Sequence, residues 1–133
     1  MIKVSSSLEF VSRSRPTRVD DAAESGWTPN TDVYATEEGL VIKVELAGMR
    51  REDLELTVEG RRLRISGQRP DGCRGPQCKF LVMEIHYGSF ETAIDVPAGY
   101  DLGKAKATYQ NGFLRVDVPF TPPGERGRRV PVA

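Results

Sequence analysis

Apolar and polar residues alternate in short runs through the middle of the chain, from Thr31 to Phe120. In the first clear run, residues 40–46, an apolar side chain stands at every second position, with Lys43 and Glu45 between them. This period of two is typical of a strand with one buried face. Comparable apolar runs follow at residues 54–58, 63–65, 80–85, 90–96, 105–109 and 114–118.

Turn residues separate these runs, and no helical pattern lies between them. Asn111-Gly112 is the strongest hairpin signal in the chain, and Pro97 and Pro119 each end a run. Short strands at this spacing predict an all-β fold, an antiparallel immunoglobulin-like β-sandwich of seven to nine strands.

Three segments lie outside the predicted sandwich. Residues 1–29 show no sustained period and are expected to form a flexible N-terminal arm, with at most a short helix. The arm carries scattered apolar residues, among them Leu8, Phe10 and Val11, which either dock on a surface or are incidental. A Gly/Pro-rich loop covers residues 69–78, and a C-terminal tail covers residues 121–133. The sandwich domain is therefore assigned to residues 30–120.

The charge balance excludes several classes of partner. The chain has 133 residues, with 19 basic and 19 acidic ones, so no excess of one sign recruits nucleic acid or an anionic membrane. The apolar runs are far shorter than the ~20 residues of a membrane helix, and the N-terminus lacks the apolar region of a secretory signal. A soluble cytoplasmic protein is expected.

Candidate catalytic chemistry is sparse, and no catalytic residue, cofactor site or metal site is predicted. The only histidine, His86, has no recognisable nucleophile motif beside it. Residues 99–105 resemble a phosphate-binding loop only faintly, because the glycine spacing is one residue short and Ala105 replaces the Ser/Thr that binds Mg²⁺. An enzyme is not expected.

Two cysteines, Cys73 and Cys78, lie in the Gly/Pro-rich loop. Two free loop thiols are the favoured interpretation, and a disulfide closing this small loop is the main alternative. A metal site with His86 is disfavoured, because the spacing is unusual and a fourth ligand is missing.

The tail ends in an apolar tip, Val130-Pro131-Val132, after a polar and basic stretch. Val130 and Val132 point to the same side of an extended segment, and Pro131 lowers the cost of ordering it. Such a tip gains free energy only if a surface receives it. The alternative is an incidental apolar end.

Several motifs together resemble the α-crystallin domain of small heat-shock proteins. The run from Ala107 through Asn111-Gly112 to Leu114 resembles the A-x-x-x-N-G-x-L signature of that family. Ala47-Gly48, the run Leu63-Arg64-Ile65-Ser66-Gly67, Tyr87-Gly88-Ser89-Phe90 and Val96-Pro97 fit its other landmarks in the right order. The resemblance covers residues 27–119. Thr92 stands where the family often has arginine, and the tail tip is V-P-V where the family usually has I-x-I/V.

The resemblance implies an ATP-independent holding chaperone that binds unfolding client proteins and forms homodimers and larger homo-oligomers. It also implies that the tail tip occupies a groove between two strands of a neighbouring subunit. The predicted groove residues are Leu54, Leu56, Val58, Ala105, Ala107 and Tyr109. The eleven residues from Pro119 to Val130 span at most ~36 Å, enough to reach a neighbour.

The same resemblance implies that dimers form by strand exchange. The exchanged strand would be Lys79, Phe80, Leu81, Val82, Met83 and Glu84, and it would pair with Asp32, Val33, Tyr34 and Ala35 of the partner. Three alternatives remain at this point: a monomeric β-sandwich co-chaperone that docks on an ATP-driven chaperone, a carbohydrate-binding or extracellular module, and a hydrolytic enzyme.

Overall fold

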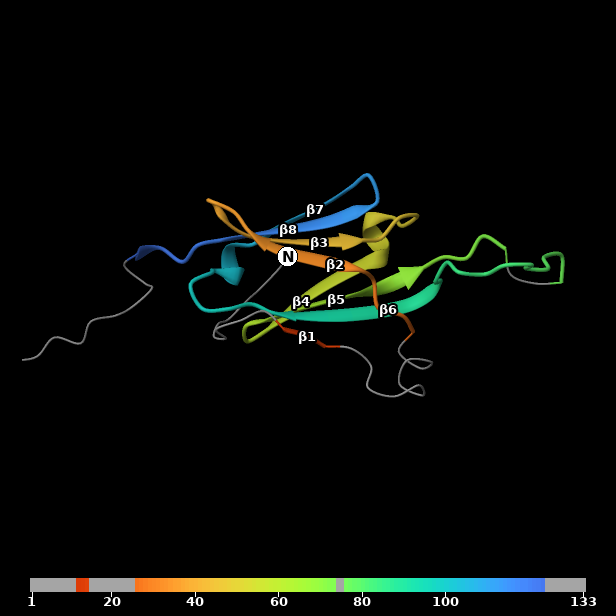
Figure 1. The fold of residues 1–133 in the computed structure, drawn as a ribbon, viewed down its shortest axis with the longest axis horizontal. Coiled ribbons are helices and arrows are strands. Elements are labelled where there is room, and N and C mark those ends of the chain that lie inside the picture. The colour runs from red at the N-terminus through yellow and green to blue at the C-terminus, as the bar shows by residue number, and fades with distance from the viewer. Residues whose placement is uncertain (1–11, 15–25, 74–75, 124–133) are drawn as a thin grey trace, which may run out of the picture.

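The protein is an all-β sandwich of two antiparallel sheets (Figure 1). The computed structural model describes residues 12–14, 26–73 and 76–123. In one sheet the strand order is β1 (Ser12–Ser14), β6 (Gly88–Asp95), β5 (Arg62–Arg69) and β4 (Leu54–Glu59). In the other it is β2 (Thr31–Ala35), β3 (Gly39–Glu45), β8 (Phe113–Pro119) and β7 (Lys106–Gln110). The 3₁₀ turns η1 (Arg51–Asp53) and η2 (Leu102–Lys104) lie between strands.

The alternation along the strands sorts side chains into a core between the sheets. In β3 and β8 the inward positions are fully buried, and they face buried positions of β5 and β6 in the other sheet. These core residues are Leu40, Ile42, Val44, Leu114, Val116, Val118, Leu63, Ile65, Phe90 and Ile94. The predicted fold class is therefore confirmed, and burial of these side chains is the main term that stabilises it.

The Asn111-Gly112 turn joins β7 to β8 as predicted. Gln110 pairs with Phe113, so the connection has two residues. Asn111 has φ 54° and Gly112 has φ 82°, the positive values that a type I′ hairpin requires at both positions.

Two sequence expectations differ from the structure. Residues 80–85 do not form a strand, because they extend beyond the end of β5 and none of the described strands pairs with them. In the described part of the arm, Ser12–Ser14 forms strand β1 on β6 and not a helix, because the edge of β6 offers unpaired backbone groups.

The sheet order determines which strands are edges. β4 and β7 end their sheets on one side of the sandwich, and β2 ends its sheet on the other side. The loop between β5 and β6 projects from one end of the sandwich, far from the loop that contains η2 (Figure 1). These two edges and this loop carry the candidate functional surfaces.

Candidate functional site: an edge groove and an exposed strand segment

A groove of about 700 Å³ lies between the edge strands β4 and β7. The walls are Leu54 and Leu56 from β4, with Ala107, Thr108, Tyr109 and Gln110 from β7; Arg51 and Leu114 complete the lining. Ala107 is exposed and small, so the β7 wall is low at this point. The groove therefore has apolar walls at Leu54, Leu56 and Ala107, with polar side chains around them that include the basic Arg51.

Tyr109 is held rigidly in the wall of this groove. Its hydroxyl donates to the carbonyl oxygen of Leu46 and accepts from the backbone N–H of Met49, the latter at 3.2 Å. Leu46 in turn donates its backbone N–H to the carbonyl oxygen of Gly112 at 2.7 Å. The β7–β8 hairpin and the turn before β4 are thus tied together, which keeps the two walls at a constant separation.

The structure brings together four of the six predicted groove residues. Leu54, Leu56, Ala107 and Tyr109 line the groove. Val58 and Ala105 do not; they are partly buried and pack against the core. The hairpin signature residues support the site from below, since Leu114 lines the groove floor and Asn111-Gly112 closes the hairpin.

Sequence reasoning missed Arg51 as a groove residue. It lies in η1, immediately before β4. The sequence offered one signal that Arg51 lines the groove: it follows the Gly48 turn and stands three residues before Leu54. A single turn at this place brings its side chains close to the start of the next strand.

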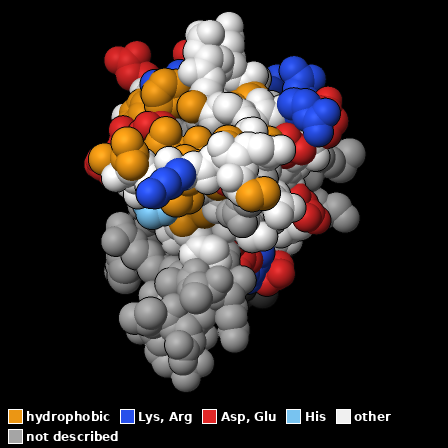
Figure 2. Space-filling model, turned by 90° about the vertical axis from the view of Figure 1, so that its right-hand side faces the viewer, with side chains coloured by type: hydrophobic (Ala, Val, Ile, Leu, Met, Phe, Trp, Pro, Cys, Tyr) orange, Lys and Arg blue, Asp and Glu red, His pale blue; other side chains and the backbone are white. Residues whose placement is uncertain are grey.

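The second candidate surface is the segment after the cysteine loop. Five apolar side chains are exposed here: Phe80 48%, Leu81 89%, Val82 73%, Met83 55% and Ile85 59%. Figure 2 views the molecule from the end at which this loop projects, and hydrophobic side chains gather on that face. An exposed apolar cluster of this kind marks an interaction surface.

The predicted acceptor of this segment is an edge strand. Residues 32–35 lie in β2, and β2 pairs only with β3 in the described residues. One side of its backbone is thus available to a further strand. Tyr34 on this strand is 41% exposed.

Arginine–carboxylate pairs cover the outer face of β5 and β6. Arg64 donates to Glu91 at 2.6 Å, and this hydrogen bond raises the pKa of the Arg64 guanidinium. Arg62 donates to Asp95 at 2.7 Å, which raises the pKa of Arg62 in the same way. Thr92, between these carboxylates in sequence, points to the core and is 1% exposed. Each pair links β5 to β6. Glu91 and Asp95 are both engaged by arginines, so these two carboxylates do not form an acid–base pair for catalysis.

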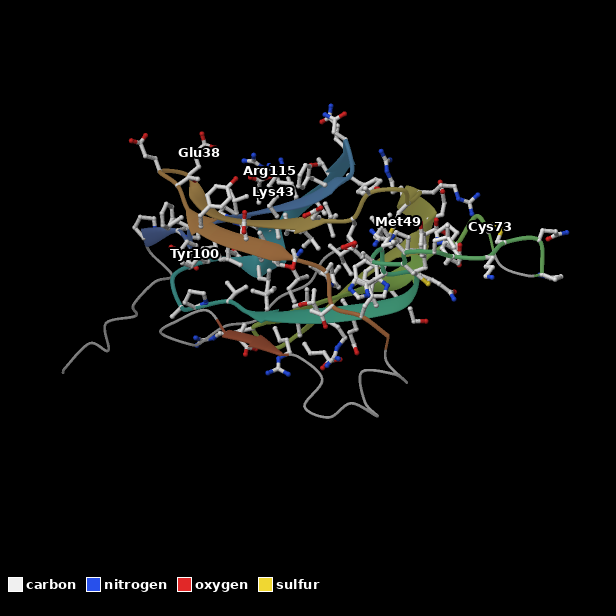
Figure 3. The ribbon with its side chains drawn as sticks, turned by 45° about the vertical axis from the view of Figure 1, so that its right-hand side comes forward. Glu38, Lys43, Met49, Cys73, Tyr100 and Arg115 are labelled. Carbon is white, nitrogen blue, oxygen red and sulfur yellow. A yellow bond between two sulfur atoms is a disulfide. The ribbon has the colours of Figure 1, made fainter. Side chains whose placement is uncertain are left out.

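The outer face of the other sheet is also charged. Lys43 lies 4.4 Å above the ring of Phe113, and Arg115 pairs with Asp117 at 3.0 Å. Figure 3 shows Lys43 and Arg115 on this face, away from the loop that carries Cys73. Val41 also belongs to this outer face of β3, because its neighbours Leu40 and Ile42 point into the core between the sheets. Its side chain is nevertheless buried, with 2% of its surface exposed.

Cys73 and Cys78 are joined as a disulfide in this structure, with their Cα atoms 6.1 Å apart. The expectation of two free thiols was therefore wrong here. This Cα separation lies in the usual range for a disulfide.

The predicted tail tip and the apolar residues of the arm cannot be placed in this structure. Val130, Pro131 and Val132 lie outside the described residues, as do Leu8, Phe10 and Val11. Among the described residues there is no group of three or more His, Cys, Asp or Glu side chains arranged to hold a metal ion. Within the same residues no helix is long and apolar enough to cross a membrane.

Comparison with known proteins identifies relatives over most of the chain. Residues 32–133 match the model of the Hsp20/alpha crystallin family. Small heat shock protein C2 of Rickettsia felis is 29% identical over 74% of this chain, and spore protein SP21 of Stigmatella aurantiaca is 32% identical over 72%. The chain spans 64% and 57% of the lengths of these two relatives.

Solved structures show the same architecture. A small heat-shock protein from Xylella fastidiosa superposes with a TM-score of 0.68 at 25% identity, covering 80% of this chain and 97% of that one. HspA from Xanthomonas axonopodis superposes with a TM-score of 0.66 at 26% identity, covering 72% and 96%.

Proposed function

Because the chain belongs to the Hsp20/alpha crystallin family, we propose that it is an ATP-independent holding chaperone that binds unfolding proteins and prevents their aggregation. Membership of this family agrees with the expectation that the chain is not an enzyme. The observation that carries the proposal is the apolar segment 80–85, whose side chains are exposed and which belongs to no strand of the described residues.

Self-assembly follows from two complementary pairs of surfaces. The exposed segment 79–84 matches the free edge of β2 in a second copy, which yields a dimer by strand exchange. The tail tip Val130-Pro131-Val132 matches the apolar groove between β4 and β7, which links dimers into larger assemblies. Both contacts use extended segments on edge strands, so both are reversible and expose apolar surface when they open.

A direct test is suppression of client aggregation without nucleotide. A model client such as citrate synthase is heated with increasing amounts of the protein, and light scattering is followed. We expect scattering to fall to the baseline near a stoichiometric subunit ratio, with no effect of added ATP, because the chain carries no phosphate-binding loop.

Serum albumin at equal mass is the inert control. Absence of suppression at stoichiometric ratios, or suppression that appears only with ATP, would contradict the proposal. The alternative of a docking co-chaperone predicts a monomer near 14.7 kDa in size-exclusion chromatography, whereas the holding chaperone elutes as a dimer or larger.

The cysteines are expected to be dispensable for this holding activity. Replacing Cys73 and Cys78 by serine opens the loop but leaves the groove and segment 80–85 intact. Suppression by this variant should equal that of the wild type, in both oxidising and reducing buffer. The matched comparison is wild type with and without reductant. A large redox-dependent loss in the wild type, or a large loss in the serine variant, would mean that the loop acts as a switch.

A further inference from the structure

The single tryptophan of the chain lies where the arm meets the sandwich. Trp27 forms an isolated parallel bridge with Phe90, in which its N–H donates to the Ser89 carbonyl at 3.1 Å and its own carbonyl accepts from Glu91 at 3.3 Å. Its ring packs on Phe90 with 5.2 Å between centroids. In Figure 1 the chain before β2 runs past the start of β6, at the end of the sandwich from which the β5–β6 loop projects. Residues 26–28 therefore follow the part of the β6 edge that β1 does not cover, just where that loop returns.

The return leg of the loop is attached to this tryptophan. The Trp27 ring stacks on His86 with 5.8 Å between centroids and 19° between planes. Its indole Nε1 donates to the Gly88 carbonyl oxygen at 3.3 Å. Segment 79–84 ends only two residues before His86, so the anchored leg is very short.

The outgoing leg is attached to the same place by Arg69, the last residue of β5. The Arg69 guanidinium lies 4.2 Å above the Trp27 ring and 5.7 Å from the Tyr87 ring. Its Nε donates to the His86 carbonyl oxygen at 2.8 Å, and its Nη1 donates to the Ala47 carbonyl oxygen at 3.3 Å. One side chain thus connects the outgoing leg, the return leg, the arm junction and the turn before β4.

We propose that Trp27 and Arg69 form a clamp that fixes the direction in which segment 79–84 leaves the sandwich, and that they are positioning residues for strand exchange. This Trp27–Arg69 clamp rests on the dimer proposed above. The contacts described above are all made at the base of the loop, and it is through this base that the two residues act.

The physical reason is the ordering cost of the exchanged strand. A segment held by flexible legs samples many directions, and pairing with the partner must restrict them. A base already fixed by a cation–π contact and three hydrogen bonds removes part of that cost before the partner arrives. Arginine suits this position, because its planar fork stacks on an aromatic face while it donates to two carbonyl oxygens.

Arg69→Gln in the full-length chain tests the clamp, with Arg64→Gln as the matched control. Both arginines lie on β5, but Arg64 pairs with Glu91 and does not touch Trp27. Trp27 is the only tryptophan, so its fluorescence reports the clamp directly. Sedimentation velocity over a dilution series, with Val130 and Val132 replaced by glycine in every sample so that assembly stops at the dimer, gives the monomer–dimer dissociation constant.

For Arg69→Gln we expect greater access of acrylamide to Trp27 and about tenfold weaker dimerisation. Arg64→Gln is expected to change neither quantity. Arg69→Lys keeps the charge but loses the fork, so it should restore dimerisation only in part.

Three outcomes overturn the proposal. Unchanged acrylamide access in Arg69→Gln would mean that Arg69 does not cover Trp27. Greater access with an unchanged dissociation constant would mean that the contact exists but does not position the loop. Equal weakening in Arg64→Gln would indicate general destabilisation of β5. Failure of strand exchange itself is recognised separately, because a variant without residues 70–84 would then remain dimeric.

Discussion

Deleting residues 70–84 is expected to leave a folded monomer, because the deletion removes the strand-exchange contact on which the proposed dimer depends. The deletion removes the exposed apolar side chains at 80–83 together with the disulfide loop. Arg69 and Gly88 are partners in the β5–β6 ladder, so Ile85, His86 and Tyr87 remain as a three-residue connection between them. Hairpins accept connections of this length, and the core between the sheets is untouched. Sedimentation velocity at micromolar concentration should show the mass of one chain.

Two length-preserving variants separate the effect of apolar side chains from that of loop length. Serine at positions 80–83 keeps the loop but removes the apolar faces, and it should also give monomers. Serine at Pro76 and Gln77 changes the same loop outside the exchanged segment and should leave the dimer intact. Dimers that persist after the deletion would place the dimer contact elsewhere on the sandwich.

Replacing Val130 and Val132 by glycine is expected to reduce the assembly to dimers at micromolar concentration. Burial of each valine side chain contributes only ~1–2 kcal/mol. The loss repeats at every tail, and linked weak contacts multiply in their effect on assembly. The tail is predicted to lie outside the sandwich domain, so the midpoint of thermal unfolding of the dimer should not change.

The tail and its groove offer matched variants on both sides of the contact. Glycine at Arg128 and Arg129 makes the same change just before the tip and should preserve the assembly. Isoleucine at both valine positions should strengthen it, by up to ~0.8 kcal/mol for each added methylene if the groove has room. Ala107→Phe fills the groove from β7 and should mimic the glycine variant. If the glycine variant keeps the wild-type size in sedimentation velocity, the arm residues Leu8, Phe10 and Val11 become the next candidates.

Much of the sandwich could be predicted because period-two alternation is a local property. Leu54, Leu56 and Val58 alternate with polar neighbours, and β4 alternates in burial just as this pattern requires. The Asn111-Gly112 hairpin was equally predictable, since few residue pairs accept two consecutive positive φ values. The groove residues Leu54 and Tyr109 followed from a family resemblance rather than from periodicity, because strand alternation does not say which edges lie side by side.

Other features depended on pairs far apart in the sequence. The hydrogen bond from Trp27 to Gly88 joins residues 61 positions apart, and the one from Tyr109 to Leu46 joins residues 63 positions apart. No short window contains either pair. Trp27 was therefore assigned to a flexible arm, although a lone tryptophan in a polar stretch was a signal of docking. The sequence favoured free thiols and left the disulfide as the alternative for a similar reason, because the path of a Gly/Pro-rich loop decides whether Cys73 and Cys78 meet.

The amino-acid sequence by itself determined the strands, the turns and the two-sheet fold, since each rests on neighbouring residues and their backbone preferences. Only the tertiary structure decided the order of strands in each sheet, and with it which edges are free. It also decided that residues 80–85, whose pattern predicts a strand, pair with no strand in the described part of their own chain. A strand needs a second strand to satisfy its backbone hydrogen bonds, and the apolar pattern of a segment does not say which chain supplies it.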